Sequence, residues 1–455
     1  MRNMNQARET FTTPEVETGM STELARIAEV VQKYPNEKIQ TLAHAINVNS
    51  LKAKHQKLDG KKATGIDEAS KAEYGQQLEQ NLEQLVERMK RQAYKPQPVR
   101  RVHIPKGNKG ETRPLGIPSY EDKLVQGVIA DILNEIYEPK FLELSYGFRP
   151  GRSCHDAIKS LNHIIETKRV NYIVDADIKG FFDNVDHNWL MEFLAHDIAD
   201  KNFLRLVKRF LKAGIMEEGK YIRSDVGTPQ GGLISPILAN IYLHYTLDLW
   251  FEKRVRRQMK GESYMIRYAD DFACAFQYEE DARKFYEMLK ERLQEFNLQI
   301  SEEKTKIIEF GRFAASNRAK RGEGKPRTFD FLGFTHYCSR SKKGKFRVKR
   351  KTSRKKLSAK MTNMKKWMWE NMHTPIPTLV AKLNPKLRGH YQYYGITDNT
   401  RSIKKFHYET MRTMLKVLRR RSQKDNMTWE KLLNILEYYP QLNPQSKSVF
   451  IPDFW

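Results

Sequence analysis

The chain has 455 residues, of which 30% are charged, and a formal net charge of +26. An excess of this size indicates a polyanionic partner, and nucleic acid before any other, although a merely soluble basic protein is the alternative. The three cysteines, Cys154, Cys274 and Cys338, lie far apart, so we expect neither a disulfide framework nor a zinc site, and a cytoplasmic location. No window approaches the ~18 consecutive apolar residues of a membrane span. The first twenty residues lack an apolar targeting core.

The order of predicted elements indicates a mixed α+β body. Residues 1 to about 40 carry no motif and form an extension of uncertain order. Helical periodicity predicts helices over about 74–94, 121–138, 153–166, 188–196, 201–213, 235–254 and 279–296. Strand-like runs occur at 99–106, 112–118 and 172–177, on both sides of 268–271, and near 305–310 and 329–334.

From about residue 340 the chain becomes more basic. Residues 340–360 contain twelve Lys or Arg and no acidic residue, which predicts a phosphate-binding surface. The remainder is helical by pattern, with further helices over about 399–420 and 428–438. Asn384-Pro385 is expected to end one helix and could start the next, with Asn as cap and Pro in the first turn.

Tyr268-Ala269-Asp270-Asp271 lies between two short apolar runs. Adjacent carboxylates at a tight turn repel each other, which a fold tolerates on a wet surface turn or where a divalent cation neutralises them. Taken alone, the Asp pair could be an ordinary hairpin turn. The strand-like run 172–177 carries two more carboxylates, Asp175 and Asp177. Three carboxylates from two strands predict a two-metal nucleotidyl-transfer site.

With Phe182 five residues after Asp177, these motifs resemble the reverse transcriptases encoded by bacterial group II introns, from about residue 40 to about 440. The resemblance implies an α+β right-hand polymerase, with fingers and an antiparallel palm sheet, followed by an all-helical thumb or maturase domain. The implied division is an N-terminal extension over 1–40, fingers and palm over 41–340, and thumb over 341–455.

The resemblance also implies the metal ligands. Asp177, Asp270 and Asp271, with the backbone carbonyl of Ile178, would hold two Mg²⁺ ions, for which Mn²⁺ is a possible substitute. Asp175 lies on the same strand face and could compete, but the family pattern selects the Asp before Ile-Lys-Gly. Lys304 matches the lysine proposed to protonate the departing pyrophosphate; an ordinary exposed lysine is the alternative.

Four residues match nucleotide-binding positions of the family. In the basic hairpin, Lys106 and Arg113 would bind the β- and γ-phosphates. Phe182 would exclude a ribose 2′-hydroxyl, with a core phenylalanine as the alternative. Gln230, in the glycine-rich loop Gly227–Pro236, would contact the incoming sugar, with a bland glycine turn as the alternative.

The primer and the RNA would be bound by further motifs. The primer end would be held by Phe331, Leu332, Gly333 and Phe334, for which a short core strand is the alternative. Template or intron RNA would be contacted by Arg149, Arg152, Lys349, Arg350, Lys351 and Arg388. We expect the three residues of the basic run on the surface. Arg388 begins a motif in which the family commonly has Trp at the position of His390.

The resemblance predicts an RNA-directed DNA polymerase of a mobile element. Its partners would be an RNA template, a DNA primer, deoxynucleoside triphosphates and a group II intron RNA, bound to aid splicing and retrohoming. No cysteine-rich endonuclease pattern follows the thumb, so we do not expect DNA cleavage. A free-standing host enzyme of defence or repair is the alternative, since the polymerase motifs fit both. A silent maturase is disfavoured because all three carboxylates are present. Oligomeric state is not predicted.

Overall fold

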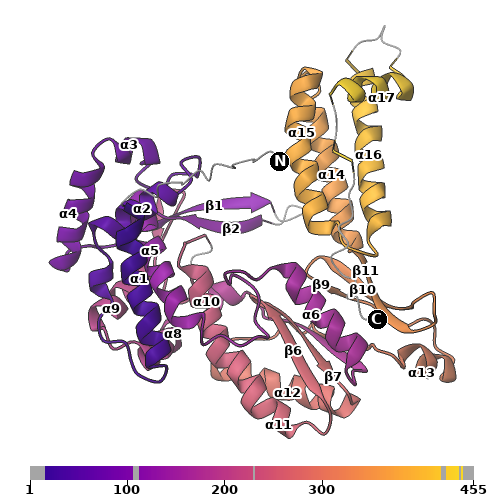
Figure 1. Cartoon of the computed structure of the whole chain (residues 1–455), viewed down its shortest axis with the longest axis horizontal. Coiled ribbons are helices and arrows are strands. Elements are labelled where there is room, and N and C mark those ends of the chain that lie inside the picture. Colours follow the sequence, from indigo (N-terminus) through magenta and orange to yellow (C-terminus); the bar gives the residue numbers. More distant parts are fainter. Residues whose placement is uncertain (1–15, 106–111, 229–230, 422–426, 440–441, 444–455) are drawn as a thin grey trace, which may run out of the picture.

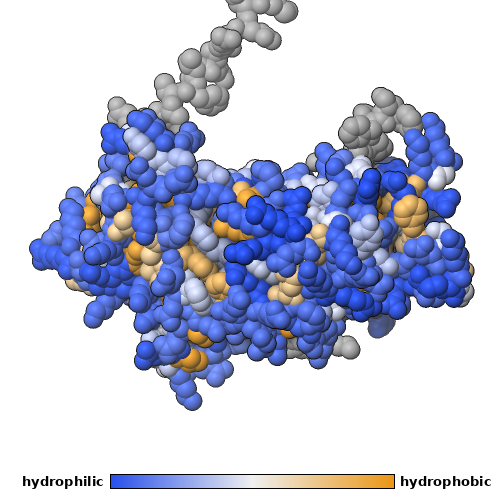
Figure 2. All heavy atoms as spheres, turned by 90° about the horizontal axis from the view of Figure 1, so that it is seen from below, coloured by the Kyte–Doolittle hydropathy of each residue, from blue (hydrophilic) through white to orange (hydrophobic). Residues whose placement is uncertain are grey.

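The computed structural model describes residues 16–105, 112–228, 231–421, 427–439 and 442–443. Figure 1 shows three parts: N-terminal helices at one end, a β-sheet with its helices in the middle, and a C-terminal helical bundle at the other end. The predicted α+β class is confirmed. On the face shown in Figure 2, hydrophilic side chains predominate and hydrophobic ones form small separate patches. Among the helices of the described residues, none is both long and apolar enough to cross a membrane.

The N-terminal part is helical, and its helices share one hydrophobic core. These helices are α1 (Val16–Lys33), η1 (Ala43–Ala45), α2 (Val48–Lys57), α3 (Lys71–Gly75), α4 (Leu78–Lys90), α5 (Tyr120–Tyr137), α8 (His187–Asp197) and α9 (Lys201–Leu211). Most residues of α5 are buried, the polar Asp122 and Gln126 among them. Ile27 and Val31 of α1 join the same core. The expected extension over 1–40 therefore contains a packed helix.

A small sheet carries the basic hairpin. Strands β1 (Val99–Pro105) and β2 (Thr112–Ile117) pair antiparallel, as predicted. The sheet order is β2-β1-β4-β5. Strands β4 (Ile215–Glu217) and β5 (Lys220–Ile222) were not expected, because three residues are too few to display an alternating pattern.

The central sheet is antiparallel, in the order β6-β7-β3-β8. Its strands are β3 (Tyr172–Asp177), β6 (Ser263–Tyr268), β7 (Asp271–Phe276) and β8 (Lys306–Glu309). Neighbouring residues of β3 enter different cores: Ile173 packs in the cluster that contains α6 (Cys154–Thr167), and Val174 in the one that contains α12 (Glu279–Glu295). Helices therefore cover both faces of this sheet.

The helix predicted over 235–254 is present, but it changes its winding. It consists of α10 (Ser235–Leu243), the π-helical segments η2 (His244–Asp248) and η3 (Phe251–Val255), and α11 (Arg256–Gln258). Such π-helical turns are rare and occur frequently at functional sites. In this chain η2 carries Asp248, whose side chain is fully buried.

A third sheet, in the order β11-β10-β9, follows α13 (Ala314–Lys320). Its strands are β9 (Phe329–Phe331), β10 (Phe334–Arg340) and β11 (Phe346–Thr352). Part of the basic run 340–360 is therefore strand, and the expected boundary at residue 341 falls within the β10–β11 hairpin.

The C-terminal bundle consists of α14 (Arg354–Glu370), α15 (Ile376–Tyr394), α16 (Thr400–Arg419) and α17 (Trp429–Tyr438), around a core of its own. The predicted helix break at Asn384-Pro385 is wrong, because α15 continues through Pro385. Leu383 and Leu387 lie on one buried face on either side of this proline. Packing of that face keeps the helix intact where an internal proline removes a backbone hydrogen bond.

Candidate active site

The three carboxylates predicted as metal ligands lie together at one end of the central sheet. Asp177, the last residue of β3, is paired with Asp271, the first residue of β7. Tyr268 pairs with Asp271, so Ala269 and Asp270 form a two-residue turn between β6 and β7. We call Asp177, Asp270 and Asp271 the carboxylate cluster. Antiparallel pairing thus brings together residues that are 94 positions apart in the sequence.

Burial and mutual repulsion disfavour the charged forms of this cluster. Burial raises the pKa of Asp271 to about 6, with further contributions from Asp270 and Asp177. Burial likewise raises the pKa of Asp270. Asp175, on the same face of β3, has its pKa raised to about 7 by burial first and then by Asp271. A cation would offset this concentration of negative charge.

Lys304 supplies a cation to the cluster. Its Nζ lies 2.6 Å from Oδ2 of Asp177, while two thirds of the Lys304 side chain stays exposed. This hydrogen bond raises the pKa of Lys304. In the described part of the chain, no three His, Cys, Asp or Glu side chains converge closely enough to form a ready metal-binding group. The cluster nevertheless fits magnesium by its all-oxygen donor set and its excess negative charge.

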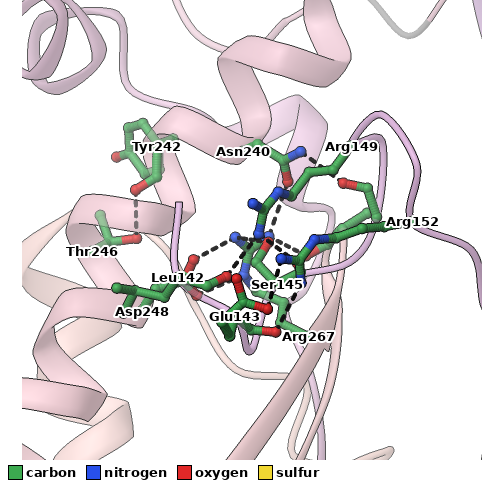
Figure 3. A network of polar contacts seen from close by, with 12 residues as sticks. Leu142, Glu143, Ser145, Arg149, Arg152, Asn240, Tyr242, Thr246, Asp248 and Arg267 are labelled. Atoms are coloured by element: carbon green, nitrogen blue, oxygen red, sulfur yellow. Dashed lines mark hydrogen bonds and ion pairs between the residues drawn. The ribbon is translucent and has the colours of Figure 1, made fainter. Parts of the chain in front are cut away.

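A buried arginine network supports the 268–271 turn (Figure 3). Arg267 is fully buried and pairs with Asp248 through Nε (2.7 Å) and Nη2 (2.5 Å). It also donates to Oδ1 of Asn240, to the Ala269 carbonyl at 3.0 Å, and to Oγ of Ser145. All five N–H groups of the guanidinium are therefore used. The network joins η2 and α10 to the turn that carries Asp270.

The backbone of this turn is also closely packed. Ala269 has φ of 55°, a left-handed conformation that is uncommon for residues other than glycine. A Cβ added at Gly147 would lie 2.2 Å from the Ala269 nitrogen, so only glycine fits there. The Gly147 carbonyl accepts a 2.7 Å hydrogen bond from Nδ2 of Asn240. A strained backbone held on several sides is typical of functional sites.

Phe182 follows β3 in the short helix α7 (Phe181–Asn184). Its side chain is half-buried, whereas that of Phe181 is buried in the core. The Phe182 carbonyl accepts a 2.8 Å hydrogen bond from the Thr228 backbone nitrogen. Gly227 has φ of 85°, and a Cβ there would lie 2.9 Å from the Asp183 carbonyl oxygen. The glycine-rich loop is thus packed directly on the helix that carries Phe182.

The remaining nucleotide-binding candidates differ in what the structure describes. Arg113 is exposed on β2, and its charge acts on Asp270. Lys106 and Gln230 lie outside the described residues. The structure therefore brings the charge of Arg113 near Asp270 and gives no position for Lys106 and Gln230.

The predicted primer-binding residues form the tight turn between β9 and β10. Phe331 pairs with Phe334, and both side chains are buried. Leu332 and Gly333, the two turn residues, have φ of 49° and 79°. Two consecutive positive φ values are the pattern of a type I′ hairpin turn. Of the four residues, only the two central ones, Leu332 and Gly333, are partly exposed to solvent.

Two arginines predicted to contact RNA, Arg149 and Arg350, are buried, and the expected surface position of Arg350 is wrong. The Arg149 guanidinium pairs with Glu138 and donates to the Leu142 and Ser145 carbonyls, with 3% of its side chain exposed. Arg350 is fully buried and pairs with Asp398 at 3.0 Å. Both guanidinium groups are thus engaged inside the fold, and removing either one would leave its carboxylate partner without its cation.

The other predicted RNA-binding residues remain accessible to different degrees. Arg152 is mostly buried and pairs with the exposed Glu143. Lys349 is half-buried, and Lys351 is exposed with its ammonium over the ring of Tyr337. Arg388 is exposed on α15. Of these four residues, Lys351 on β11 and Arg388 on α15 are exposed.

Comparison with known proteins decides the family. The model described as "Reverse transcriptase (RNA-dependent DNA polymerase)" matches residues 104–336, about half of the chain. The model described as "Group II intron, maturase-specific domain" matches residues 345–433. The chain belongs to the group II intron reverse transcriptases. The first match contains the carboxylate cluster, and the second contains β11 and most of the C-terminal bundle.

Individual relatives agree with this family. The group II intron-encoded protein LtrA of Lactococcus lactis subsp. cremoris is 32% identical over 412 residues, covering 75% of this chain and 67% of LtrA. Protein YkfC of Escherichia coli (strain K12) is 36% identical over 242 residues, 47% of this chain and 63% of YkfC. An uncharacterized 91 kDa protein in the cob intron of Schizosaccharomyces pombe is 42% identical over 171 residues, 38% of this chain and 21% of that protein.

The chain is therefore an RNA-directed DNA polymerase joined to an intron maturase domain, with nucleic acid partners that include intron RNA. Reverse transcriptases of this family use divalent metal ions. The interpretation as a free-standing host enzyme is not favoured, because the maturase-specific match covers the C-terminal part.

Two residues of the site were missed from the sequence. Arg267 precedes the 268–271 turn, and Asp248 comes from the long helix after the glycine-rich loop. The sequence offered one signal, which was Arg267 itself. It is a charged residue inside a strand, and the two residues before it, Met265 and Ile266, pack in different cores. Asp248 carried no signal, because its burial depends on the π-helical winding of η2.

Proposed function

We propose that Asp177, Asp270 and Asp271, with the Ile178 carbonyl, hold two Mg²⁺ ions for nucleotidyl transfer to a DNA primer. The observation that carries the proposal is the pairing of Asp177 with Asp271 beside the strained turn of Asp270. When bound, two such ions neutralise charge on the attacking oxygen, the transferred phosphate and the leaving pyrophosphate. The raised pKa values of Asp270 and Asp271 support a site that favours added positive charge. Mn²⁺ is a possible substitute.

The residues around the cluster have separate proposed tasks. Arg113, with Lys106, binds the nucleotide phosphates, because a guanidinium offers paired donors to phosphate oxygens. Gln230 contacts the incoming sugar from the glycine-rich loop. Lys304 protonates the leaving pyrophosphate, and its ammonium is already 2.6 Å from Asp177. Phe331, Leu332, Gly333 and Phe334 hold the primer end.

Phe182 is the proposed sugar discriminator. Replacing Phe182 with alanine should raise ribonucleotide incorporation about tenfold, equivalent to ~1.4 kcal/mol in the barrier, while deoxynucleotide incorporation stays measurable. The physical reason is that the half-buried ring would fill the volume that a 2′-hydroxyl needs. Single-nucleotide incorporation assays measure the ratio. Phe313→Ala removes an exposed ring elsewhere and serves as the control. Unchanged sugar selectivity in Phe182→Ala would show that Phe182 is only a core residue.

We propose that intron RNA and template bind the accessible basic surface of β11 and the C-terminal bundle. Lys349, Lys351 and Arg388 belong to this surface, and Arg152 contacts template after releasing Glu143. Binding of intron RNA would aid splicing and retrohoming. The cytoplasmic location expected from the cysteine content is part of the same proposal.

Changing Lys349 and Lys351 together to glutamine should flatten the dependence of RNA affinity on salt. Each phosphate contact contributes about 0.7–0.9 to the slope of log affinity against log salt, so the slope should fall by roughly 1.4–1.8. Arg350 is left intact because its loss would leave Asp398 buried without its partner. Lys260 and Lys284, near the start of α12, are the matched control pair. If the slope of log affinity against log salt is equal in both double variants, the β11 lysines face solvent and do not contact RNA.

A further inference from the structure

The turn between β9 and β10 is held by the C-terminal bundle. Its two residues, Leu332 and Gly333, each offer a carbonyl oxygen. The hydroxyl of Tyr393, near the end of α15, donates to the Leu332 carbonyl at 2.9 Å. The backbone nitrogen of Ser353, at the start of α14, donates to the Gly333 carbonyl at 3.0 Å. Both carbonyls of the turn are therefore bound by residues at the ends of bundle helices.

The Leu332 carbonyl is the one whose direction defines the turn. It belongs to the peptide between the two central residues, and rotation of this peptide interconverts type I′ and type II′ turns. Leu332 has φ of 49°, which is costly for a branched side chain. A hydrogen bond to its carbonyl selects one orientation of the peptide. Burial raises the pKa of Tyr393, so the hydroxyl keeps the proton that it donates.

Tyr393 is itself fixed from two directions. Its ring stacks on Phe334 with centroids 5.9 Å apart and planes at 15°. Its backbone carbonyl accepts a 2.7 Å hydrogen bond from Nε2 of His155, in the first turn of α6. Tyr394 also packs at the turn, where a Cβ at Gly333 would lie 3.0 Å from its hydroxyl. The hydroxyl of Tyr393 thus has little freedom to leave the Leu332 carbonyl.

We propose that Tyr393 is a positioning residue that sets the 331–334 turn, and through it the primer terminus, from the thumb. This inference rests on the proposed primer-binding role of the turn. The contacts of Tyr393 described above are with Leu332, Phe334 and His155, none of which belongs to the carboxylate cluster. Its effect is on how often the primer 3′-hydroxyl is aligned for attack, so it should change the rate of incorporation and leave nucleotide affinity unaltered.

The test is Tyr393→Phe, which removes only the hydroxyl. Tyr391→Phe is the matched control, because Tyr391 lies on the same helix and its hydroxyl bonds instead to Nδ1 of His407 at 2.9 Å. In single-turnover extension of a DNA primer on RNA, we expect Tyr393→Phe to lower the maximal rate about three- to tenfold, as the loss of one hydrogen bond allows. The apparent nucleotide dissociation constant should change less than about twofold in both variants, and the Tyr391→Phe rate should match the wild type.

A second variant separates this inference from the assignment on which it rests. Gly333→Ala adds a Cβ at φ of 79° and disturbs the turn directly. If Gly333→Ala slows primer extension and Tyr393→Phe does not, the role of Tyr393 is overturned, while the primer-binding role of the turn still stands. If Gly333→Ala extends the primer at the wild-type rate, the turn does not bind the primer, and the inference about Tyr393 fails as well. Equal slowing of Tyr393→Phe and Tyr391→Phe would also overturn the inference, because a general change in the thumb would then be the cause.

Discussion

Replacing Asp270 with alanine is expected to abolish extension of a DNA primer on an RNA template. The side chain belongs to a cluster in which three carboxylates share the binding of cations, so its loss should disturb the spacing of both. We expect a rate at least ~10³-fold below the wild type, equivalent to ~4 kcal/mol in the barrier. Quantitative primer extension at saturating magnesium measures this loss.

The control for this variant is Asp225→Ala. Asp225 is an exposed carboxylate paired with Arg223, and its loss should leave extension within about twofold of the wild type. RNA affinity of Asp270→Ala should equal that of the wild type, since the basic surface of β11 is not part of the cluster. Appreciable extension by purified Asp270→Ala would show that the metal ligands are assigned wrongly.

Asp248→Asn should destabilise the fold and slow synthesis together. This change keeps the shape of the side chain and removes the charge that Arg267 contacts through two nitrogens. Breaking a buried pair from one side costs about 3–5 kcal/mol, so the thermal midpoint should fall. With Arg267 less firmly held, its bond to the Ala269 carbonyl weakens, and we expect the extension rate to drop by about tenfold at temperatures where the variant is folded.

Asp197→Asn separates the two effects of Asp248→Asn. Asp197 is also a buried carboxylate bonded to a cation, Lys140, but it makes no contact with the 268–271 turn. Its amide variant should lose stability without a comparable loss in the rate of the folded enzyme. Equal rates for the two amide variants, measured where both are folded, would reduce Arg267 to a purely structural role.

Much of the active site could be predicted because its residues lie next to strong local patterns. The Asp270-Asp271 pair is flanked by two apolar runs, and Asp177 ends a third; antiparallel pairing then leaves few ways to arrange them. The basic hairpin was marked by turn residues between two strand-like runs. Local patterning therefore located the strands, and the family resemblance assigned their roles.

The burial of Arg350 could not be predicted, because it depends on a contact across the fold. Arg350 lies between Lys349 and Lys351 on β11, and the alternation of the strand sends only Arg350 of these three fully inward. Its partner, Asp398, comes 48 residues later in the chain. The sequence of the basic run does not indicate which of its residues will pair with Asp398.

The burial of Arg149 and the helical conformation of Pro385 could not be predicted, for related reasons. Arg149 is buried because Glu138 and nearby carbonyls surround its guanidinium, and these acceptors meet it only in the folded chain. Pro385 remained helical because α15 packs on both sides of it, a property that its local sequence does not display. In both cases tertiary contacts outweigh the local signal.

The most direct test of the two-ion site is a crystal structure of the protein with RNA template, DNA primer and an unreactive deoxynucleotide analogue in Mn²⁺. Anomalous scattering locates manganese without reference to the polypeptide. We predict two ions about 3.5–4 Å apart, with ligands from Asp177, from the Asp270-Asp271 turn and from the Ile178 carbonyl. Manganese bound only elsewhere, or a nucleotide phosphate held without any ion on Asp177, would contradict the site.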